Sequence, residues 1–272
     1  MLEISSKMDG FSLGSLISSR DEILSALWRM LSSLTPDEVE SSYTLSVFRR
    51  DYKALLTVIS SLERNLKRRR RLLDLGCGYG FLTEFFASIL KFNEIYGVDL
   101  DLERLKKASE RANVVRLDLE NDSLPFSDGT FDLVMCFGVL DHLKFFDNIF
   151  SETYRVLDID GLFLVSCTNL GSWDSRICSL LGYQPRHVEV SSKYLVGVPK
   201  IYYTVPRPVG HIHTCTLKAL KEIAFLYGFT PIWETGLKTT HPNKLVKLID
   251  TVLSKRPGLA TRYLLLLGKR KM

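Results

Sequence analysis

Apolar residues recur at intervals of three and four along the first 70 residues, which is the spacing of one face of an α-helix. Two capping-box patterns, Ser19-Arg-Asp-Glu22 and Thr35-Pro-Asp-Glu38, predict that helices begin at these points, the second with Pro at its first helical position. A third helix is expected over residues 47–66, with an apolar stripe made of Leu55, Leu56, Ile59 and Leu62. We expect residues 1–70 to form an N-terminal helical cap that covers the following domain or serves as its lid.

From residue 71 onward the pattern changes to short apolar runs that alternate with amphipathic helices. The runs predict seven strands, at residues 72–75, 95–98, 114–117, 131–137, 162–166, 231–234 and 262–267. Helices are expected after the glycine-rich segment of the first strand and at residues 102–112, 145–157, 217–227 and 244–253. Regular β-α-β alternation places parallel strands in one sheet with helices on both faces. The fold class is therefore α/β, with a seven-stranded, mainly parallel, doubly wound sheet in residues 71–272.

The composition is that of a folded globular protein, because 46% of the 272 residues are hydrophobic and 25% are charged. This apolar content excludes a disordered chain, and no apolar run approaches the roughly 20 residues that cross a bilayer. Residues 1–10 lack the cationic and apolar regions of a signal peptide. The five cysteines are scattered without a Cys-x-x-Cys pair, which argues against a disulfide framework or a zinc ribbon. We therefore expect a cytoplasmic protein.

The net charge of +5 is concentrated in one segment of the chain. Residues 63–71 hold six bases and one acid, and the remainder is balanced. One interpretation is a binding site for an anionic partner such as RNA or a lipid surface. The other is the carboxyl end of a helix, where bases complement the helix dipole just before the first strand. We favour the second, because no aromatic residue interleaves the run as in proteins that bind single-stranded nucleic acid.

The segment that begins with the first strand, Leu72-Leu-Asp-Leu-Gly-Cys-Gly-Tyr-Gly80, indicates a ligand site. Its three glycines let the backbone turn tightly and let a ligand lie directly against it. A carboxylate at Asp74, near the end of an apolar strand, is costly unless it contacts a ligand or loop amides. The spacing G-x-G-x-G differs from the G-x-G-x-x-G of dinucleotide sites, so a nicotinamide cofactor is the weaker interpretation. A tight turn without a ligand is the other alternative.

Acidic residues also follow the second and third predicted strands. Asp99 comes about 20 residues after the glycines, where a carboxylate can accept hydrogen bonds from both hydroxyls of a ribose. Asp118 and Leu119 follow the third strand and are placed to meet an adenine amino group and ring. A bare turn does not explain a carboxylate at the end of the neighbouring strand, so these residues favour a nucleoside ligand.

These segments, with Leu124-Pro-Phe-Ser-Asp-Gly-Thr-Phe-Asp-Leu-Val134 before the fourth strand, resemble the class I S-adenosylmethionine-dependent methyltransferases. The resemblance is to the small-molecule (type 11, UbiE-like) group and covers about residues 72–171. It implies a Rossmann-like methyltransferase fold, with S-adenosyl-L-methionine as co-substrate and no metal ion. The cofactor-binding residues that it implies are Asp74, Gly76, Cys77, Gly78, Gly80, Asp99, Leu100, Asp118, Leu119 and Phe137.

Two further features bear on this resemblance. The family's sheet ends in a hairpin with an antiparallel seventh strand, which suits the predicted strands at residues 231–234 and 262–267. The step from Asp118 to the Leu-Pro-Phe segment is longer than in the family. This departure leaves Glu120 and Asp122 as substitutes for Asp118 beside the adenine.

Methyl transfer from a sulfonium needs a general base only where the acceptor atom starts protonated, so no fixed catalytic triad is expected. Candidate catalytic residues are Asp141 and His142 after the fourth strand, and His211 in Gly210-His-Ile-His-Thr-Cys-Thr216, a segment that resembles one common in this group. Each has a local alternative. Asp141 would cap or ion-pair nearby, His142 would pack under the next helix, and His211 would make a hydrogen bond at a helix entry. A metal site at the His-x-His pair lacks the other ligands that it needs.

The segment at about residues 170–215 interrupts the alternation and is expected to be an inserted cap that determines the substrate. It is rich in aromatic residues, prolines and histidines, which predicts an apolar acceptor pocket with few polar anchors. A packed cap without ligand contact, or a dimer surface, is the alternative. We interpret the chain as a methyltransferase that acts on an O, N or C atom of a small, lipid-like or aromatic acceptor. An RNA or protein methyltransferase, or a non-catalytic partner subunit of the same fold, are the other hypotheses.

Overall fold

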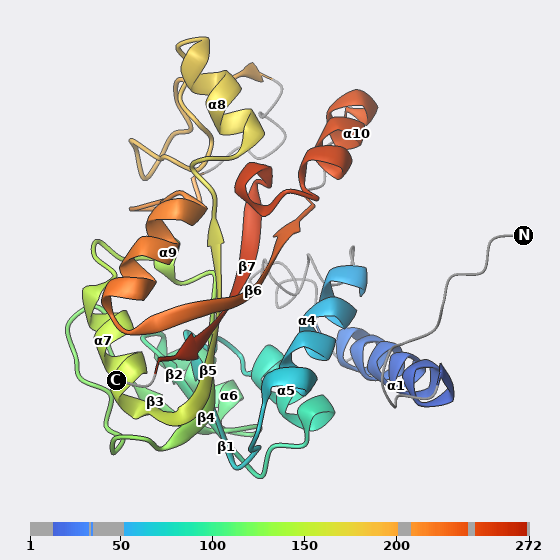
Figure 1. Cartoon of the computed structure of the whole chain (residues 1–272). Coiled ribbons are helices and arrows are strands. Elements are labelled where there is room, and N and C mark those ends of the chain that lie inside the picture. Colours follow the sequence, from blue (N-terminus) through green and yellow to red (C-terminus); the bar gives the residue numbers. More distant parts are fainter. Residues whose placement is uncertain (1–12, 33, 35–51, 201–207, 239–242, 271–272) are drawn as a thin grey trace, which may run out of the picture.

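A seven-stranded sheet runs through the molecule in the order β3-β2-β1-β4-β5-β7-β6 (Figure 1). In this computed structural model, which describes residues 13–32, 34, 52–200, 208–238 and 243–270, neighbouring strands from β3 to β5 are parallel. β7 is antiparallel to both β5 and β6, so the predicted hairpin is confirmed. The strands are β1 (Arg71–Leu75), β2 (Glu94–Asp99), β3 (Asn113–Arg116), β4 (Phe131–Phe137), β5 (Leu157–Thr168), β6 (Phe229–Leu237) and β7 (Arg262–Lys269).

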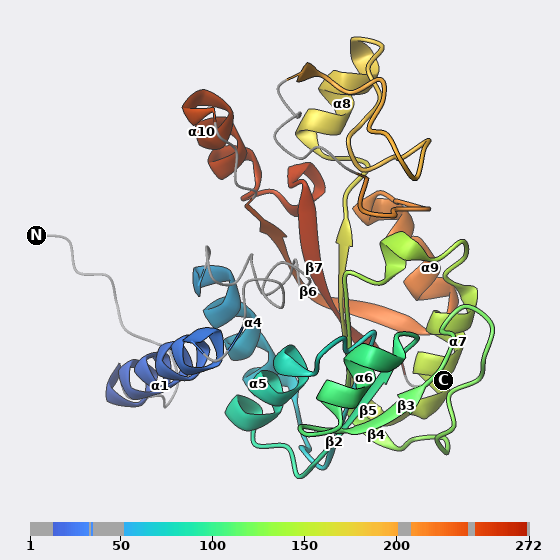
Figure 2. The same cartoon turned by 180° about the vertical axis from the view of Figure 1, so that it is seen from behind.

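Helices cover both faces of this sheet, as Figures 1 and 2 show from opposite sides. They are α1 (Leu13–Ser32), α4 (Tyr52–Asn65), α5 (Phe81–Leu90), α6 (Leu102–Ala108), α7 (Asp147–Val156), α8 (Trp173–Leu180), α9 (Leu217–Leu226) and α10 (Lys244–Leu253), with short 3-10 helices η1 (Leu140–His142) and η3 (Pro257–Leu259). None of the described helices combines the length and the hydropathy that a membrane-spanning segment needs.

The strands read as nearly continuous apolar runs because both of their faces are buried. In β1, Leu73 and Leu75 belong to a core shared with α7 and α9, whereas Leu72 belongs to a core shared with α1, α4 and α5. The same alternation holds along β4, β5 and β7. The seven-stranded α/β sheet that the sequence predicts is therefore confirmed in its strand number and in its two-sided cover.

The N-terminal helices pack on the sheet, and one of their predicted starts is wrong. α1 begins at Leu13, so Ser19 lies inside the helix and does not cap it. Leu13, Leu16 and Ile17 continue the helical spacing of the later residues, and a serine in a helix interior costs only about 0.5 kcal/mol. The second capping box, at Thr35, and residues 47–51 of the third predicted helix lie outside the described residues.

Most strands extend one or two residues beyond the predicted bounds, and β5 and β6 extend furthest. β5 begins at Leu157, directly after α7, where the apolar pattern had been assigned to the helix. Its register to β4 shifts between the pairs that Phe131 and Leu133 form, so residues 158–161 bulge out of the ladder without ending the strand. β6 also carries a register shift at Pro231, which an edge strand tolerates because one side of it has no ladder to complete.

The basic run at residues 63–71 forms ion pairs at the amino-terminal edge of the sheet. α4 ends at Asn65, so the expectation that the whole run complements a helix dipole is wrong for the bases that follow. The acids that hold them come from the starts of β2 and β4 and from the bulge of β5. The pairs are Lys67–Asp160, Arg68–Asp158, Arg70–Asp132, Arg70–Asp158 and Arg71–Glu94, with N···O distances of 2.6 to 3.1 Å.

The burial of α4 predicts that the N-terminal helices unfold together with the sheet. Ile59 is fully buried in the core that includes Leu72 of β1, and Lys53 is exposed on the same helix. Replacing Ile59 by Ala should lower the free energy of unfolding by about 2–4 kcal/mol, since it leaves a cavity in that shared core. Lys53→Ala should change it by less than about 0.5 kcal/mol. Urea unfolding followed by circular dichroism measures both; an Ile59→Ala midpoint equal to that of wild type would contradict this packing.

Candidate active site

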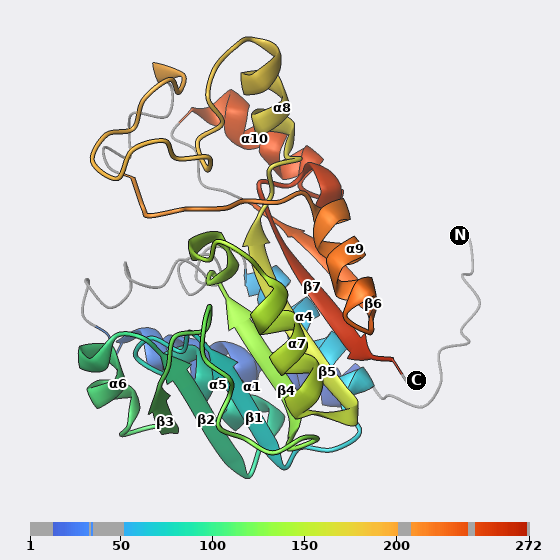
Figure 3. The same cartoon turned by 90° about the vertical axis from the view of Figure 1, so that its left-hand side faces the viewer.

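A cavity of ≈ 770 Å³ opens at the carboxyl ends of the parallel strands. β1, β2, β3 and β4 each end at its wall. Figure 3 shows these four strands side by side in the order β3-β2-β1-β4. The segment between α8 and α9 closes it from the other side with Arg186, His187, Glu189, Leu195, Val209 and His211. Its volume is typical of small-molecule sites, and an open α/β sheet binds its ligands at this edge.

The glycine loop turns from β1 into α5 beneath this cavity. The Gly76 and Cys77 amides both donate to the Val98 carbonyl of β2, at 2.7 and 3.0 Å. Gly76 has φ +77°, and a Cβ there would lie 2.2 Å from Cγ2 of Val139, so only glycine fits. Gly78 has φ +55°, yet a Cβ on it would meet no atom within 4 Å. The loop is therefore packed on one side at Gly76 and open toward the cavity at Gly78.

Asp99, at the end of β2, lies directly beside this opening. Its Oδ2 accepts a hydrogen bond from the Gly78 amide at 2.8 Å, and its Oδ1 accepts one from the Asp101 amide at 2.9 Å. Each carboxylate oxygen can accept two hydrogen bonds, so both retain acceptor capacity toward the cavity. Two backbone donors thus hold the carboxylate in position, and a ligand with two neighbouring hydroxyls could use the remaining lone pairs.

Asp74 lies deeper, at the base of the cavity in β1. Its Oδ2 accepts a hydrogen bond of 2.6 Å from Oγ1 of Thr83, a residue of α5 that the sequence reasoning missed. Burial, with a smaller contribution from the nearby Asp99, raises the pKa of Asp74 to about 7. Thr83 could have been found from its place in the first turn of the helix after the glycines, where a polar side chain faces back toward the strand.

Of the three acids proposed to contact the adenine, the loop after β3 brings only two to the cavity. Asp118, Leu119 and Glu120 line the cavity, but Asp122 does not. Asp122 instead accepts a hydrogen bond from the Asp118 amide at 2.9 Å. Hydrogen bonds from the Asn121 side chain and the Glu120 amide lower the pKa of Asp118. Asp122 therefore shapes the loop that presents Asp118 and Glu120.

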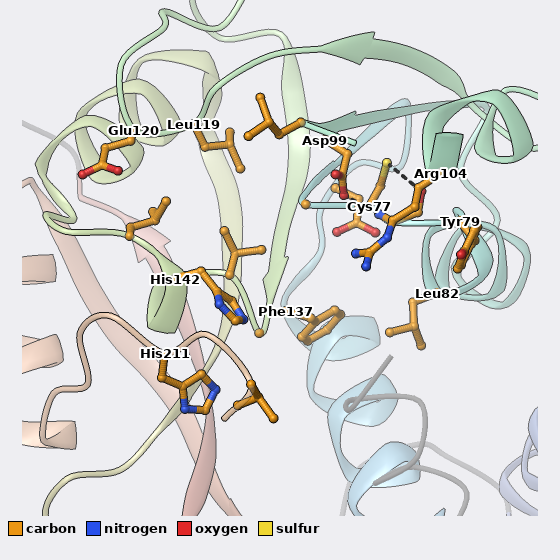
Figure 4. A pocket seen from close by; sticks show the side chains of 18 of the residues that line it. Cys77, Tyr79, Leu82, Asp99, Arg104, Leu119, Glu120, Phe137, His142 and His211 are labelled. Carbon is orange, nitrogen blue, oxygen red and sulfur yellow. Dashed lines mark hydrogen bonds between the residues drawn. The ribbon is translucent and has the colours of Figure 1, made fainter. Parts of the chain in front are cut away.

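The remaining residues of the predicted cofactor site divide into lining and supporting positions. Cys77, Leu100 and Phe137 line the cavity, whereas Gly80 lies outside it as the residue before α5. Burial raises the pKa of the Cys77 thiol, which stays neutral and packs against Gly97 of β2. In Figure 4, Asp99, Arg104 and Tyr79 lie on the side of the glycine loop, and Phe137 stands between them and the two labelled histidines.

His142 brings a ring nitrogen to the other side of the cavity. Its Nδ1 lies 2.8 Å from the Gly210 carbonyl oxygen, which can only accept, so Nδ1 carries the hydrogen. The neutral ring therefore has its lone pair on Nε2. The ring of His211 lies 5.3 Å from that of His142, in an edge-to-face arrangement (Figure 4). His142 is exposed and lines the cavity, so its predicted packing under the next helix does not occur.

Asp141, by contrast, does not line the cavity, because its side chain is fully buried beneath η1. It accepts hydrogen bonds from the Thr168 amide and hydroxyl, and Arg262 lies 3.9 Å away. Burial alone would raise the pKa of Asp141, but Arg262, His211 and Thr168 outweigh it and lower that pKa. Its carbonyl also accepts from the Ile212 amide at 2.7 Å. Asp141 therefore contacts the histidine segment through its backbone and keeps its side chain away from the cavity.

Three polar residues of the inserted segment, Arg186, His187 and Glu189, reach the cavity although no motif singled them out. The Glu189 carboxylate accepts from the amides of Val209, Gly210 and, at 3.0 Å, His211, and so fixes the approach of that histidine. Burial and two nearby guanidinium groups lower the pKa of His187 to about 3, and burial also lowers that of His211. Both imidazoles are therefore neutral at physiological pH.

The His-x-His pair does not converge on one point. His211 faces the cavity, whereas Nδ1 of His213 lies 2.8 Å from the Lys144 carbonyl and its ring lies 5.4 Å from that of Phe146, in a tilted arrangement. Within the described residues, no three His, Cys, Asp or Glu side chains gather closely enough to hold a metal ion.

Comparison with known proteins points to the same part of the chain. A family model described as a methyltransferase domain matches residues 73–165. An uncharacterized protein of Methanocaldococcus jannaschii is 36% identical over 42% of this chain and 48% of its own length. The malonyl-[acyl-carrier protein] O-methyltransferase of Legionella pneumophila is 29% identical over 48% of this chain and 50% of its own length. The mitochondrial ubiquinone biosynthesis O-methyltransferase of Saccharomyces cerevisiae is 28% identical over 50% of this chain and 47% of its own length. The chain thus spans about half the length of these relatives.

Solved structures show the same fold at low sequence identity. A crystal structure of a methyltransferase fold from Bacillus halodurans covers 79% of this chain and all of its own, with a TM-score of 0.54 and 16% identity. The family match, the relatives and the cavity at the glycine loop agree with one another. Residues 73–165 thus match a methyltransferase domain, and over that part the chain is similar to S-adenosylmethionine-dependent methyltransferases.

Proposed function

We propose that this protein transfers a methyl group from S-adenosyl-L-methionine to a small-molecule acceptor bound in the same cavity. The observation that carries the proposal is the 2.8 Å contact between Asp99 and the Gly78 amide, beside open space, inside a cavity of ≈ 770 Å³. Backbone amides hold this carboxylate beside the glycine loop. The carboxylate fits the hydroxyls of a ribose, and the open side of the loop leaves room for the methionine part of the cofactor. No dinucleotide is needed to account for it.

The residues of the cavity suit a cofactor that carries positive charge. Four carboxyl groups, those of Asp74, Asp99, Asp118 and Glu120, line the half formed by β1, β2 and β3. Such a wall attracts a sulfonium and an ammonium group. In our proposal Asp74 and the glycine loop hold the methionine part, Asp99 holds the ribose hydroxyls, and Asp118 or Glu120, with Leu119 and Leu100, surrounds the adenine. Phe137 separates this half from the acceptor half.

The cofactor, when bound, supplies an electrophilic methyl group, and the chain's own contribution is alignment and exclusion of water. His142 is the candidate base for an acceptor that starts protonated, because its Nε2 lone pair is free to take a proton while Nδ1 is held by the Gly210 carbonyl. Asp141 and Glu189 act at a distance, since they position the segment that carries His211.

The acceptor half is built by the inserted segment, with Leu195, Val209 and Leu143 among its apolar residues. The names of two relatives mention an acyl-carrier substrate and ubiquinone biosynthesis, which supports an apolar or lipid-like acceptor. The structure supports an RNA acceptor less well than the basic run in the sequence does. Four of the six bases in the run, from Lys67 to Arg71, are ion-paired at the opposite edge of the sheet.

The proposal predicts that the Asp99 carboxylate contributes strongly to cofactor affinity. Asp99→Asn should weaken the binding of S-adenosylhomocysteine about tenfold to a hundredfold, because it loses charge-assisted hydrogen bonds to two hydroxyls. Isothermal calorimetry measures this affinity. Asp101→Asn is the matched control, since Asp101 caps α6 outside the cavity and Asn caps equally well. Absence of heat from the wild-type protein at millimolar ligand would overturn the proposed function.

The raised pKa of Asp74 predicts that cofactor binding depends on pH. In the free protein Asp74 is largely protonated below about pH 7. A cationic ligand favours the carboxylate, so the affinity for S-adenosylmethionine should rise as the pH increases through about 7 and level off above it. Binding at about pH 6 should release a proton, seen as a heat that varies with the ionisation enthalpy of the buffer. Asp74→Asn should abolish both effects. If the pH profile of that variant is unchanged, a group other than Asp74 causes the pH dependence.

The candidate base predicts a separation of catalysis from binding. His142→Gln should lower methyl transfer to an oxygen or nitrogen acceptor by about 10²–10⁴-fold, because proton removal is lost. The affinity for S-adenosylhomocysteine should stay within about twofold, since no cofactor contact is assigned to this residue. Turnover of S-adenosylmethionine over a panel of acceptors, followed as S-adenosylhomocysteine formed, gives the first value, and calorimetry with S-adenosylhomocysteine gives the second. Full activity of His142→Gln on a protonated acceptor would exclude it as the base.

A further inference from the structure

α10 is an amphipathic helix whose apolar side faces away from the protein. Its buried residue is Asp250, whose Oδ1 accepts a hydrogen bond of 3.1 Å from the Trp173 indole of α8. Leu245, Leu248 and Val252, spaced three and four apart, form an exposed stripe on another side of the helix. An amphipathic surface helix normally turns its apolar stripe to the core. α10 does the reverse, so its stripe is available to something outside the chain.

α8 adds a second exposed apolar group at the same end of the molecule. Ile177, Leu180 and Leu181 are exposed, and Leu180, at 85%, is the most open large apolar side chain among the described residues. α8 and α10 both project beyond the carboxyl end of β5 (Figures 1, 2 and 3). They meet through Trp173 and Asp250. We call this end, residues 170–183 and 243–256, the α8–α10 tip.

The exposed charge of the α8–α10 tip has a single sign. Its two acids, Asp174 and Asp250, are both buried, and Thr261 donates to each. Its bases are all exposed: Arg176, Lys244, Lys247, Lys255 and Arg256. On α10 the two lysines lie next to the apolar stripe, where their stems can run along a surface while their ammonium groups stay in water. The tip therefore offers apolar side chains bordered by five positive charges.

We propose that the α8–α10 tip docks on the surface of a membrane that contains anionic lipids. Apolar side chains inserted at the headgroup boundary, flanked by Lys and Arg, are the features of an interfacial helix. A second copy of the chain is a poorer partner, since a two-fold interface would bring five uncompensated positive charges against the same five. The occupant that complements both the stripe and the charge is an anionic bilayer.

The tip is continuous with the wall of the cavity. Leu181, at the end of α8, precedes the lining residue Arg186 by only five positions, and the chain from Tyr183 to Tyr194 carries two exposed tyrosines, which suit a membrane interface. Docking would place the acceptor half of the cavity next to the bilayer. Membrane binding itself requires neither cofactor nor turnover, so it can be tested independently of the proposed methyl transfer.

Sedimentation with lipid vesicles tests the proposal on the full chain without cofactor. The wild type should bind vesicles of phosphatidylcholine with 30% phosphatidylglycerol at low salt, and bind pure phosphatidylcholine at least tenfold more weakly. Leu248→Glu should reduce binding at least tenfold, and Lys244→Gln with Lys247→Gln should reduce it about fivefold for each charge removed. The matched controls are Leu226→Glu, at a leucine of α9 that is more exposed than Leu248, and Lys53→Gln with Lys106→Gln.

Three results would overturn the proposal. One is a wild-type protein that fails to bind the anionic vesicles while S-adenosylhomocysteine binding shows it to be folded. The other is a dimer in light scattering that Leu248→Glu converts to a monomer without any change in vesicle binding, which would assign the tip to a second copy. Equal loss of binding in Leu226→Glu would also overturn it, because the effect would then not belong to this end of the molecule.

Discussion

The site depends on one contact, the hydrogen bond by which the Gly78 amide holds the Asp99 carboxylate. It ties the bend after β1 to the end of β2, so two neighbouring parallel strands present a carboxylate and a stretch of bare backbone to the same space. The contact requires a positive φ at Gly78, and the close approach of Val139 requires that Gly76 have no side chain. The ligand contacts that we propose are arranged around this carboxylate and this stretch of backbone.

Charge is used differently at the two edges of the sheet. At the amino-terminal edge, bases and acids from the starts of β1, β2, β4 and β5 neutralise one another in ion pairs. At the carboxyl edge the acids of β1, β2 and β3 face a cavity and have mostly backbone amides or hydroxyls as partners. The raised pKa of Asp74 reports the cost of this arrangement, since burial disfavours its charged form. A positively charged ligand would offset that cost.

The fold was predictable because strands buried on both faces leave a strong apolar signal, and the glycines with Asp99 identify the cofactor edge. What the sequence could not provide were interactions between residues far apart in it. Asp141 was an equal candidate with His142 until the structure showed that Thr168 and Arg262 bury it. The capping box at Ser19 failed because the helix begins at Leu13, and a serine in a helix interior costs only about 0.5 kcal/mol.

The α8–α10 tip shows the same limit most clearly. Periodicity predicted α10 with its correct bounds, but a period does not say which side of a helix meets the protein. That choice is made by Trp173, whose indole donates to Asp250 and turns the carboxylate inward. The leucine stripe must then face outward, because both groups cannot occupy the same side of one helix. The outward-facing stripe of α10 thus accompanies the hydrogen bonds that hold Asp250 against Trp173 and Thr261.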